Sequence, residues 1–100
     1  MALDSTLNEI DRHFAAFICR LAETDDRSLW VAAALVSQAV GNGNICLDLA
    51  DAVKSDLANE QGFGDAESWA ARLRGQSVVG GSGQFAPLIL DSANRLYLHR

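Results

Sequence analysis

The residues that could carry chemistry in this 100-residue chain are two histidines, two cysteines, and scattered serines and carboxylates. His13 lies between Arg12 and Phe14, and His99 is the penultimate residue. Nucleophilic and acid–base catalysis require a positioned pair or triad of such groups, and neither histidine has a partner at a suitable spacing. We therefore expect no independent catalysis from these residues.

Metal binding receives no more support. Cys19 and Cys46 both lie among apolar neighbours, and neither belongs to a CxxC pair or stands at metal-ligand spacing from a histidine. Such thiols are most often small buried apolar residues. The carboxylates fall on the polar faces of the helices expected below, without a pair at metal spacing. The sequence predicts no metal, no cofactor and two free thiols.

A glycine-rich stretch from Gln76 to Gln84 includes Gly80, Gly81 and Gly83. A phosphate-binding loop would need Lys followed by Ser or Thr, a strong strand before it and a helix after it. All three are missing, so this stretch is interpreted as a flexible connection.

Charge is unevenly distributed. Residues 1 to 70 carry 12 acids and 4 bases, whereas residues 71 to 100 carry 1 acid and 4 bases, and the net charge is -5. Nucleic-acid binding depends mainly on clustered Lys and Arg, so an acidic chain is a poor candidate for it. The mildly basic C-terminal part could contact a phosphate or an acidic partner, or could simply be solvated.

The elements that must position these groups are arranged around residues 29 to 49. From Leu29 to Val40 the chain is uncharged and rich in alanine, which predicts a central helix capped by Asp26 or Ser28 and ended at Gly41. The apolar run Ile45 to Leu47 is too short for a helix and predicts a strand over 44–47.

An amphipathic helix is expected before this block, from Leu3 to Leu21, with Asp4 or Ser5 as its cap. Apolar residues recur along it at steps of three and four, which predicts one buried stripe. The stripe consists of Leu3, Leu7, Ile10, Phe14, Phe17, Ile18 and Leu21.

Two short helices are expected after the strand. Asp48 can cap the first, with Leu49, Ala50, Val53 and Leu57 on one face.

Asp65 can cap the second, from Ala66 to Arg74, with Trp69 and Leu73 on a common face and Gly75 as its stop. Two apolar runs around Asp91-Ser92-Ala93-Asn94 then predict a β-hairpin over 86–99.

This order of elements predicts a mainly α (α+β) fold in a single domain over residues 1–100. A short strand at 44–47 and the hairpin at 86–99 would form a small three-stranded antiparallel sheet. With the helices, this is a winged-helix-like bundle carrying an extra N-terminal helix. In that arrangement Ala66 to Arg74 would be the DNA-reading helix, but Asp65 and Glu67 would meet phosphates at its start.

Protein docking is therefore the preferred function, and a small winged-helix DNA-binding regulator is the alternative. The residues expected to bind a partner are Trp30, Arg72, Arg74 and Tyr97. No apolar run approaches the roughly 18 residues of a membrane span, and acids occupy the N-terminus where a secretory signal carries bases. We expect no membrane contact and a cytoplasmic location.

Two segments resemble a known family. The block AAALVSQAVGNGNICLDLA (Ala32 to Ala50) and the closing APLILDSANRLYLHR (Ala86 to Arg100) are similar to the N-terminal region of the alpha subunit of bacterial exodeoxyribonuclease V, the RecD helicase subunit of RecBCD. The opening DRHFAAFICRL resembles the first helix of that region. These are packing patterns and not chemical motifs.

The resemblance implies a non-catalytic, subunit-interaction domain of a larger protein. That protein would be an ATP-dependent 5′ to 3′ DNA helicase acting in double-strand-break repair and recombination. The domain would contact the gamma and beta subunits of exodeoxyribonuclease V, and DNA only through the complex. ATP and magnesium would bind in helicase domains that lie outside this chain, and no ligand residue carries over.

Overall fold

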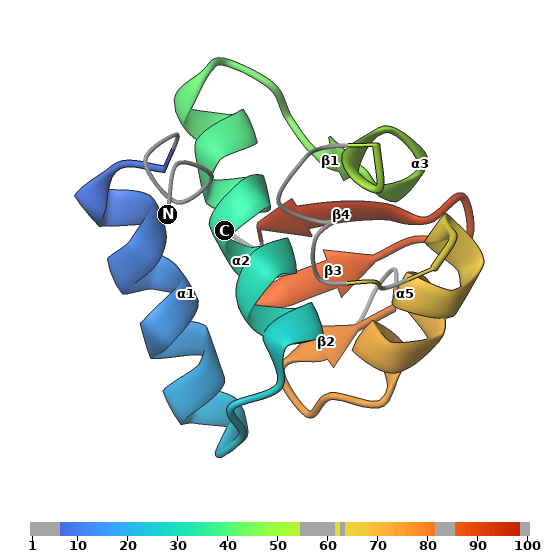
Figure 1. The fold of residues 1–100 in the computed structure, drawn as a ribbon, viewed down its shortest axis with the longest axis horizontal. Helices are drawn as coiled ribbons and strands as arrows, with labels where there is room; N and C mark the ends of the chain where they lie inside the picture. Colours follow the sequence, from blue (N-terminus) through green and yellow to red (C-terminus); the bar gives the residue numbers. More distant parts are fainter. Residues whose placement is uncertain (1–6, 55–61, 63, 82–85, 99–100) are drawn as a thin grey trace.

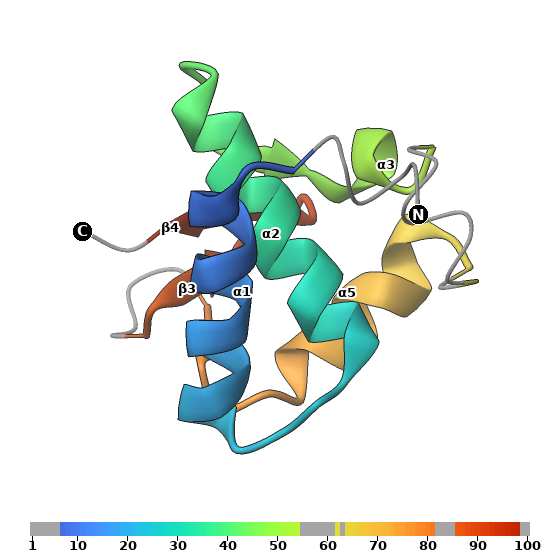
Figure 2. The same cartoon turned by 60° about the vertical axis from the view of Figure 1, so that its left-hand side comes forward.

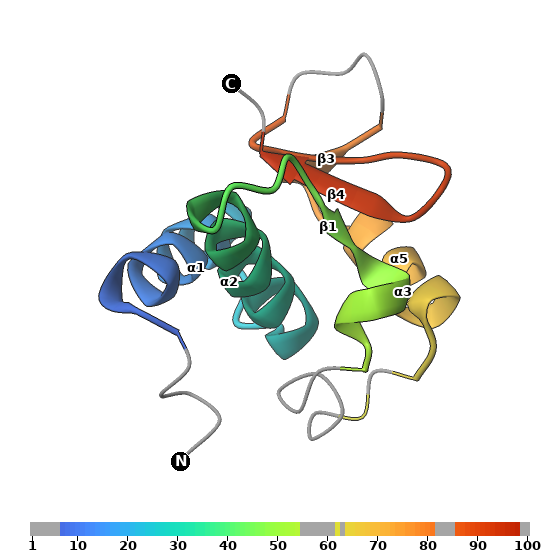
Figure 3. The same ribbon diagram turned by 90° about the horizontal axis from the view of Figure 1, so that it is seen from above.

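The computed structural model describes residues 7–54, 62, 64–81 and 86–98 (Figure 1). Helix α1 (Glu9–Ala22) packs on α2 (Arg27–Gly41), and α2 also contacts α5 (Ala66–Arg74) and strands β1 (Leu47–Asp48) and β4 (Arg95–Leu98). Seen from above, α1 and α2 run side by side while the sheet, α3 (Leu49–Ala52) and α5 lie on the other side of α2 (Figure 3). The predicted mainly α fold with a small sheet is confirmed.

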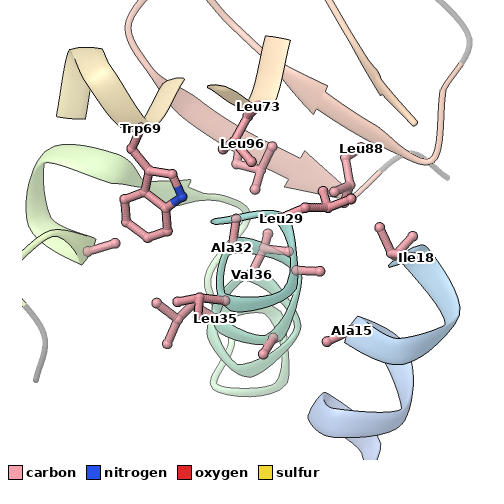
Figure 4. Close-up of a cluster of buried hydrophobic side chains, with 14 of the residues drawn as sticks. Ala15, Ile18, Leu29, Ala32, Leu35, Val36, Trp69, Leu73, Leu88 and Leu96 are labelled. Carbon is pink, nitrogen blue, oxygen red and sulfur yellow. The ribbon is translucent and has the colours of Figure 1, made fainter. Parts of the chain in front are cut away.

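Helix α2 is the centre of the core, as its uncharged sequence predicts. Asp26 caps its start by accepting a hydrogen bond from the Ser28 amide. Figure 4 shows its side chains meeting Ala15 and Ile18 of α1, Trp69 and Leu73 of α5, and Leu88 and Leu96 of the sheet. Every residue from Ser28 to Val36 except Trp30 is buried, because neighbours surround this half of the helix.

The strand predicted over 44–47 is wrong in its position, because β1 occupies Leu47–Asp48. Asn42 caps α2, and Gly43 then adopts a φ of +95°, a conformation that glycine enters without a steric cost. The Asn44 amide donates to the Ala39 carbonyl at 2.9 Å, so it closes the helix and is not free to pair with a strand. Ile45 is consequently 81% exposed.

The sheet contains four strands in the order β1-β4-β3-β2, and not the three predicted. The hairpin is confirmed, with β3 (Leu88–Leu90) antiparallel to β4 (Arg95–Leu98). Leu47 of β1 pairs with Leu96 of β4, as expected of the short strand.

The additional strand, β2 (Val79–Gly80), pairs parallel to β3 and lies in the stretch that was interpreted as a loop. Two residues contain no periodicity that the sequence could reveal.

Helix α1 begins later than predicted, at Glu9, with Asn8 as its cap and Asp11 completing a capping box. The predicted start at Leu3 and the caps Asp4 and Ser5 lie outside the described residues.

The prediction of one buried stripe on α1 is confirmed only in part, because Leu7 and Ile18 are buried but three of its other members are not. Small residues take most of the buried face, which comprises Asp11, Ala15, Ile18 and Cys19. Ile10, Phe17 and Leu21 are exposed, and Phe14 is half-buried. Figure 2 shows α1 on the outside of the molecule, in front of α2.

The two shorter helices are capped as predicted. Asp48 caps α3 (Leu49–Ala52), which buries Leu49 and Ala52, while Ala50 is exposed; Leu57 lies outside the described residues.

Asp65 caps α5, which ends at Gly75. The Trp69 indole N–H donates to the Ser28 carbonyl at 3.0 Å, so α5 is fixed to the start of α2.

Candidate interaction surface

Reactive groups do not gather in the part of the chain that the structure describes. Across residues 7–54, 62, 64–81 and 86–98, no three His, Cys, Asp or Glu side chains lie close enough together to hold a metal ion. His13 is exposed on α1, and His99 lies outside the described residues. None of the described helices has the length and apolar character needed to cross a bilayer.

Both thiols are free, and Cys19 is not set up as a nucleophile. Cys19 is buried, and this burial, reinforced by the nearby carboxylate of Asp26, raises its pKa. A raised pKa disfavours the thiolate, which is the reactive form of cysteine. Cys46 is half-buried beside β1.

A polar network centres on Asp91, in the turn between β3 and β4. Its carboxylate accepts hydrogen bonds from the amides of Ala93 and Arg95, from Arg95 Nε at 3.1 Å and from the Tyr97 hydroxyl at 3.0 Å. Partial burial raises the pKa of Asp91, but the hydrogen bonds from Arg95, Tyr97 and Ala93 outweigh it, so the pKa is lowered. The hydrogen bond between Tyr97 and Asp91, together with partial burial, raises the pKa of Tyr97.

Two of the predicted partner-binding residues belong to this network. Arg74 donates to the Asp91 carbonyl at 3.2 Å and to Asn94 Oδ1 at 3.1 Å, and Asn94 in turn donates to Glu67 Oε1 at 2.7 Å. Arg74 and Tyr97 therefore both bond to Asp91, but only Arg74, together with Glu67, joins α5 to the hairpin, whereas the Tyr97 bond lies within the hairpin.

The other two predicted residues lie outside the network. Trp30 is half-buried in the first turn of α2, and the Arg27 guanidinium stands 4.7 Å from the centre of its ring. This is a cation–π geometry. Arg72 is exposed in the last turn of α5. The role of all four residues in binding a partner stays a prediction.

A polar hollow of about 320 Å³ lies between the start of α1 and the end of α2. Its lining residues are Asn8, Asp11, Gln38, Gly41 and Asn42. Asp11 is only 3% exposed, and it accepts hydrogen bonds from Ser37 Oγ at 2.7 Å and from the Asn8 amide at 3.3 Å. Its carboxylate thus joins α1 to α2 and is not presented to a ligand.

An apolar stripe runs along the outer side of α1. It consists of Ile10, Phe17 and Leu21, which are 73%, 49% and 47% exposed, together with half-buried Phe14, and we call it the outer stripe. Sequence reasoning placed these residues in the core. The sequence contains one signal for the alternative buried face of α1. Ala15, Cys19 and Ala22 share that face, and their small size suits close packing against an alanine-rich helix.

The chain was compared with known proteins. The family model described as "RecBCD enzyme subunit RecD, N-terminal domain" matches residues 4–97. No curated protein matches the chain.

Proposed function

The chain belongs to the family of RecD N-terminal domains of the RecBCD enzyme, and from this premise we propose that it is a non-catalytic assembly domain. Its function is to hold a RecD-type subunit in a heterotrimeric complex for double-strand-break repair and recombination. It binds the other subunits of that complex, chiefly the gamma subunit and also the beta subunit.

The observation that carries this proposal is the extent of the family match. Residues 4–97 include every described helix and strand except Leu98, the last residue of β4, so the match concerns the fold as a whole and not one motif. The described polar groups are compatible with a structural role, because Asp11, Asp91 and Arg74 are all hydrogen-bonded to other residues of the chain.

The remaining parts of the proposal concern the protein to which such a domain belongs. We propose that this protein is an ATP-dependent 5′ to 3′ helicase located in the cytoplasm. ATP and magnesium would be bound by its helicase domains, and DNA would be reached only through the complex. The coding sequence beyond Arg100 is then expected to contain a GxxxxGK[ST] segment, whose backbone amides and lysine hold nucleotide phosphates.

The DNA-binding alternative receives less support from α5. Asp65 caps this helix, and Glu67 accepts a hydrogen bond from Asn94, so carboxylates occupy its first turn. Two arginines lie in the last turn of α5, and both are exposed. Arg74 is already hydrogen-bonded to the hairpin turn, which leaves Arg72 to contact a phosphate.

The proposal is tested by copurification. The chain is coexpressed with the gamma and beta subunits of the same organism, and the gamma subunit carries the affinity tag. We expect the chain to elute with the gamma subunit in a stoichiometric complex. If folded chain, verified by circular dichroism, is left behind by the tagged subunits, the assembly function is wrong. Salt-sensitive binding of the chain alone to duplex DNA would favour the regulator instead.

A further inference from the structure

The outer stripe of α1 is a regular feature of the helix. Ile10, Phe14, Phe17 and Leu21 follow one another at steps of four, three and four residues. At 3.6 residues per turn, their side chains fall within about 60° of arc. The apolar residues therefore form one continuous line along the helix and are not scattered over its surface.

The core accounts for only one member of this line, half-buried Phe14, which packs against it. Helix α1 buries a different face, the one that carries Asp11. Asp11 accepts a hydrogen bond from Ser37 of α2, which lies one helical turn after Ala33 and Ala34. Ile18 is the large apolar side chain of that buried face, whereas Ile10, Phe17 and Leu21 stay outside the contact, with Ile10 73% exposed. Single exposed apolar residues are common, but a contiguous patch of them marks an interaction site.

The size of the stripe indicates the kind of occupant. From Ile10 to Leu21 the helix rises about 17 Å, and a helix is about 10 Å wide, so the stripe covers on the order of 200 Å². A stable interface buries about 800 Å² on each partner. Two copies of this domain that met only through this stripe would not form a stable dimer, and each would bring its net charge of -5. The stripe therefore suits a partner that is also held elsewhere.

Charge beside the stripe indicates the chemistry of that partner. His13 and Arg20 lie one turn beyond Ile10 and Phe17, along the same side of the stripe, and both are exposed. Neither forms an ion pair with another described residue. Glu9 adds one negative charge at the N-terminal end of this side. A partner that places carboxylates opposite Arg20 would complement it.

We propose that the outer stripe is the docking site for another subunit of the RecBCD-type complex, which presents an apolar groove with carboxylates along the rim that faces Arg20. This inference rests on the proposed assembly function and identifies the surface that performs it. Phe17 and Leu21 fill the groove, and Arg20 fixes the orientation of the helix within it.

The test uses the full chain with its gamma and beta subunits and measures the dissociation constant of the complex. The double variant Phe17→Ser/Leu21→Ser is expected to weaken binding by about tenfold or more, because buried anchors carry most of the binding energy. Arg20→Glu is expected to weaken it by a smaller factor, and this loss should grow as the salt concentration falls. The matched control is Ile45→Ser, which removes a more exposed apolar side chain away from the stripe and should bind like wild type.

Thermal unfolding of each variant separates docking from folding. If the double variant unfolds, Ile10→Ser replaces it, because a side chain that is 73% exposed contributes little to the core. Wild-type affinity in folded stripe variants would overturn the docking site while leaving the assembly function intact. A wild-type chain that binds no subunit would instead refute the assembly function itself. If light scattering detects a homodimer of the wild-type chain that the stripe variants do not form, the stripe binds a second copy of the chain and the proposal is overturned.

Discussion

The contact between α1 and α2 and the contact between α5 and the β3–β4 turn are held together by different forces. The first is an apolar contact in which small side chains such as Ala15 meet an alanine-rich helix, with one buried hydrogen bond from Ser37 to Asp11. In the second, Arg74 of α5 donates hydrogen bonds to the Asp91 carbonyl and to Asn94 of the turn, and Asn94 donates to Glu67 of α5. The turn itself is held by the Asp91 carboxylate, which accepts from Arg95 and Tyr97.

The difference shows how sensitive each region is to a given kind of change. Apolar packing depends on side-chain volume and is indifferent to the protonation of surface groups. A network built on a carboxylate depends on the charge of that carboxylate. Changes in volume should therefore damage the α1–α2–α5 core, and changes in pH should damage the turn.

The largest expected effect is that of Trp69→Ala, which removes the largest fully buried side chain of the described residues. Loss of apolar contacts and the cavity left behind should lower the free energy of unfolding by about 3–5 kcal/mol. Trp69→Phe is the control, since it keeps a ring but leaves the Ser28 carbonyl without its donor, and it should cost less. Denaturant unfolding measures both. Equal losses would mean that the hydrogen bond, and not volume, holds α5 to α2.

Overpacking of the α1–α2 contact should have the next largest effect. Ala15 is fully buried in this contact, so Ala15→Leu should lower the free energy of unfolding by about 1–3 kcal/mol as the helices move apart. The neighbouring exposed residue provides the control, because Ala16→Leu should stay within about 0.5 kcal/mol of wild type. If both variants unfold like wild type, the two helices are not closely packed.

Asp91→Asn should expose the pH dependence of the turn. The pKa of Asp91 is lowered in the folded chain, so its stabilising effect is present above its unfolded pKa of about 4 and is lost as the pH falls through the folded pKa. Wild type should be more stable by about 2 kcal/mol near neutral pH, and the difference should disappear in acid. Unfolding curves measured over a pH series test this, with Asp51→Asn as an exposed control. A difference that persists in acid would contradict the role of the charge.

Tyr97→Phe should have the smallest effect, because the other donors to Asp91 remain. The pKa of Tyr97 is raised, chiefly by its hydrogen bond to Asp91, so its contribution is present below the unfolded pKa of about 10 and is lost as the pH rises through the folded pKa. Ultraviolet titration is unambiguous because the chain has one tyrosine. The pKa of Tyr97 should fall in Asp91→Asn, and an unchanged value would exclude the bond.

Sequence patterns predicted those elements whose signals are local. The uncharged stretch of α2, the caps Asp26, Asp48 and Asp65, and the hairpin turn at Asp91 all depend on a few neighbouring residues. The family resemblance is confirmed by the match over residues 4–97.

The errors arose where tertiary contacts decide between alternatives. On α1 two apolar faces compete, and only contact with the small residues of α2 determines that Ala15 is buried and Phe17 is not. Strand β2 is defined by its pairing with β3 and has no pattern of its own. The outer stripe could not be predicted for the same reason, because it is what remains of α1 after the closer-packing face has been buried.

The hydrogen bond between Ser37 and Asp11 determines the register of α1 along α2. Two helices that touch through alanines could slide by one turn at little cost, since each methyl group would find an equivalent neighbour. A donor and an acceptor have no such second position, and a one-turn slip would strand a buried carboxylate in apolar surroundings. This polar pair therefore fixes the height of α1 along α2, and with it the level at which each outward side chain of α1 stands on the surface.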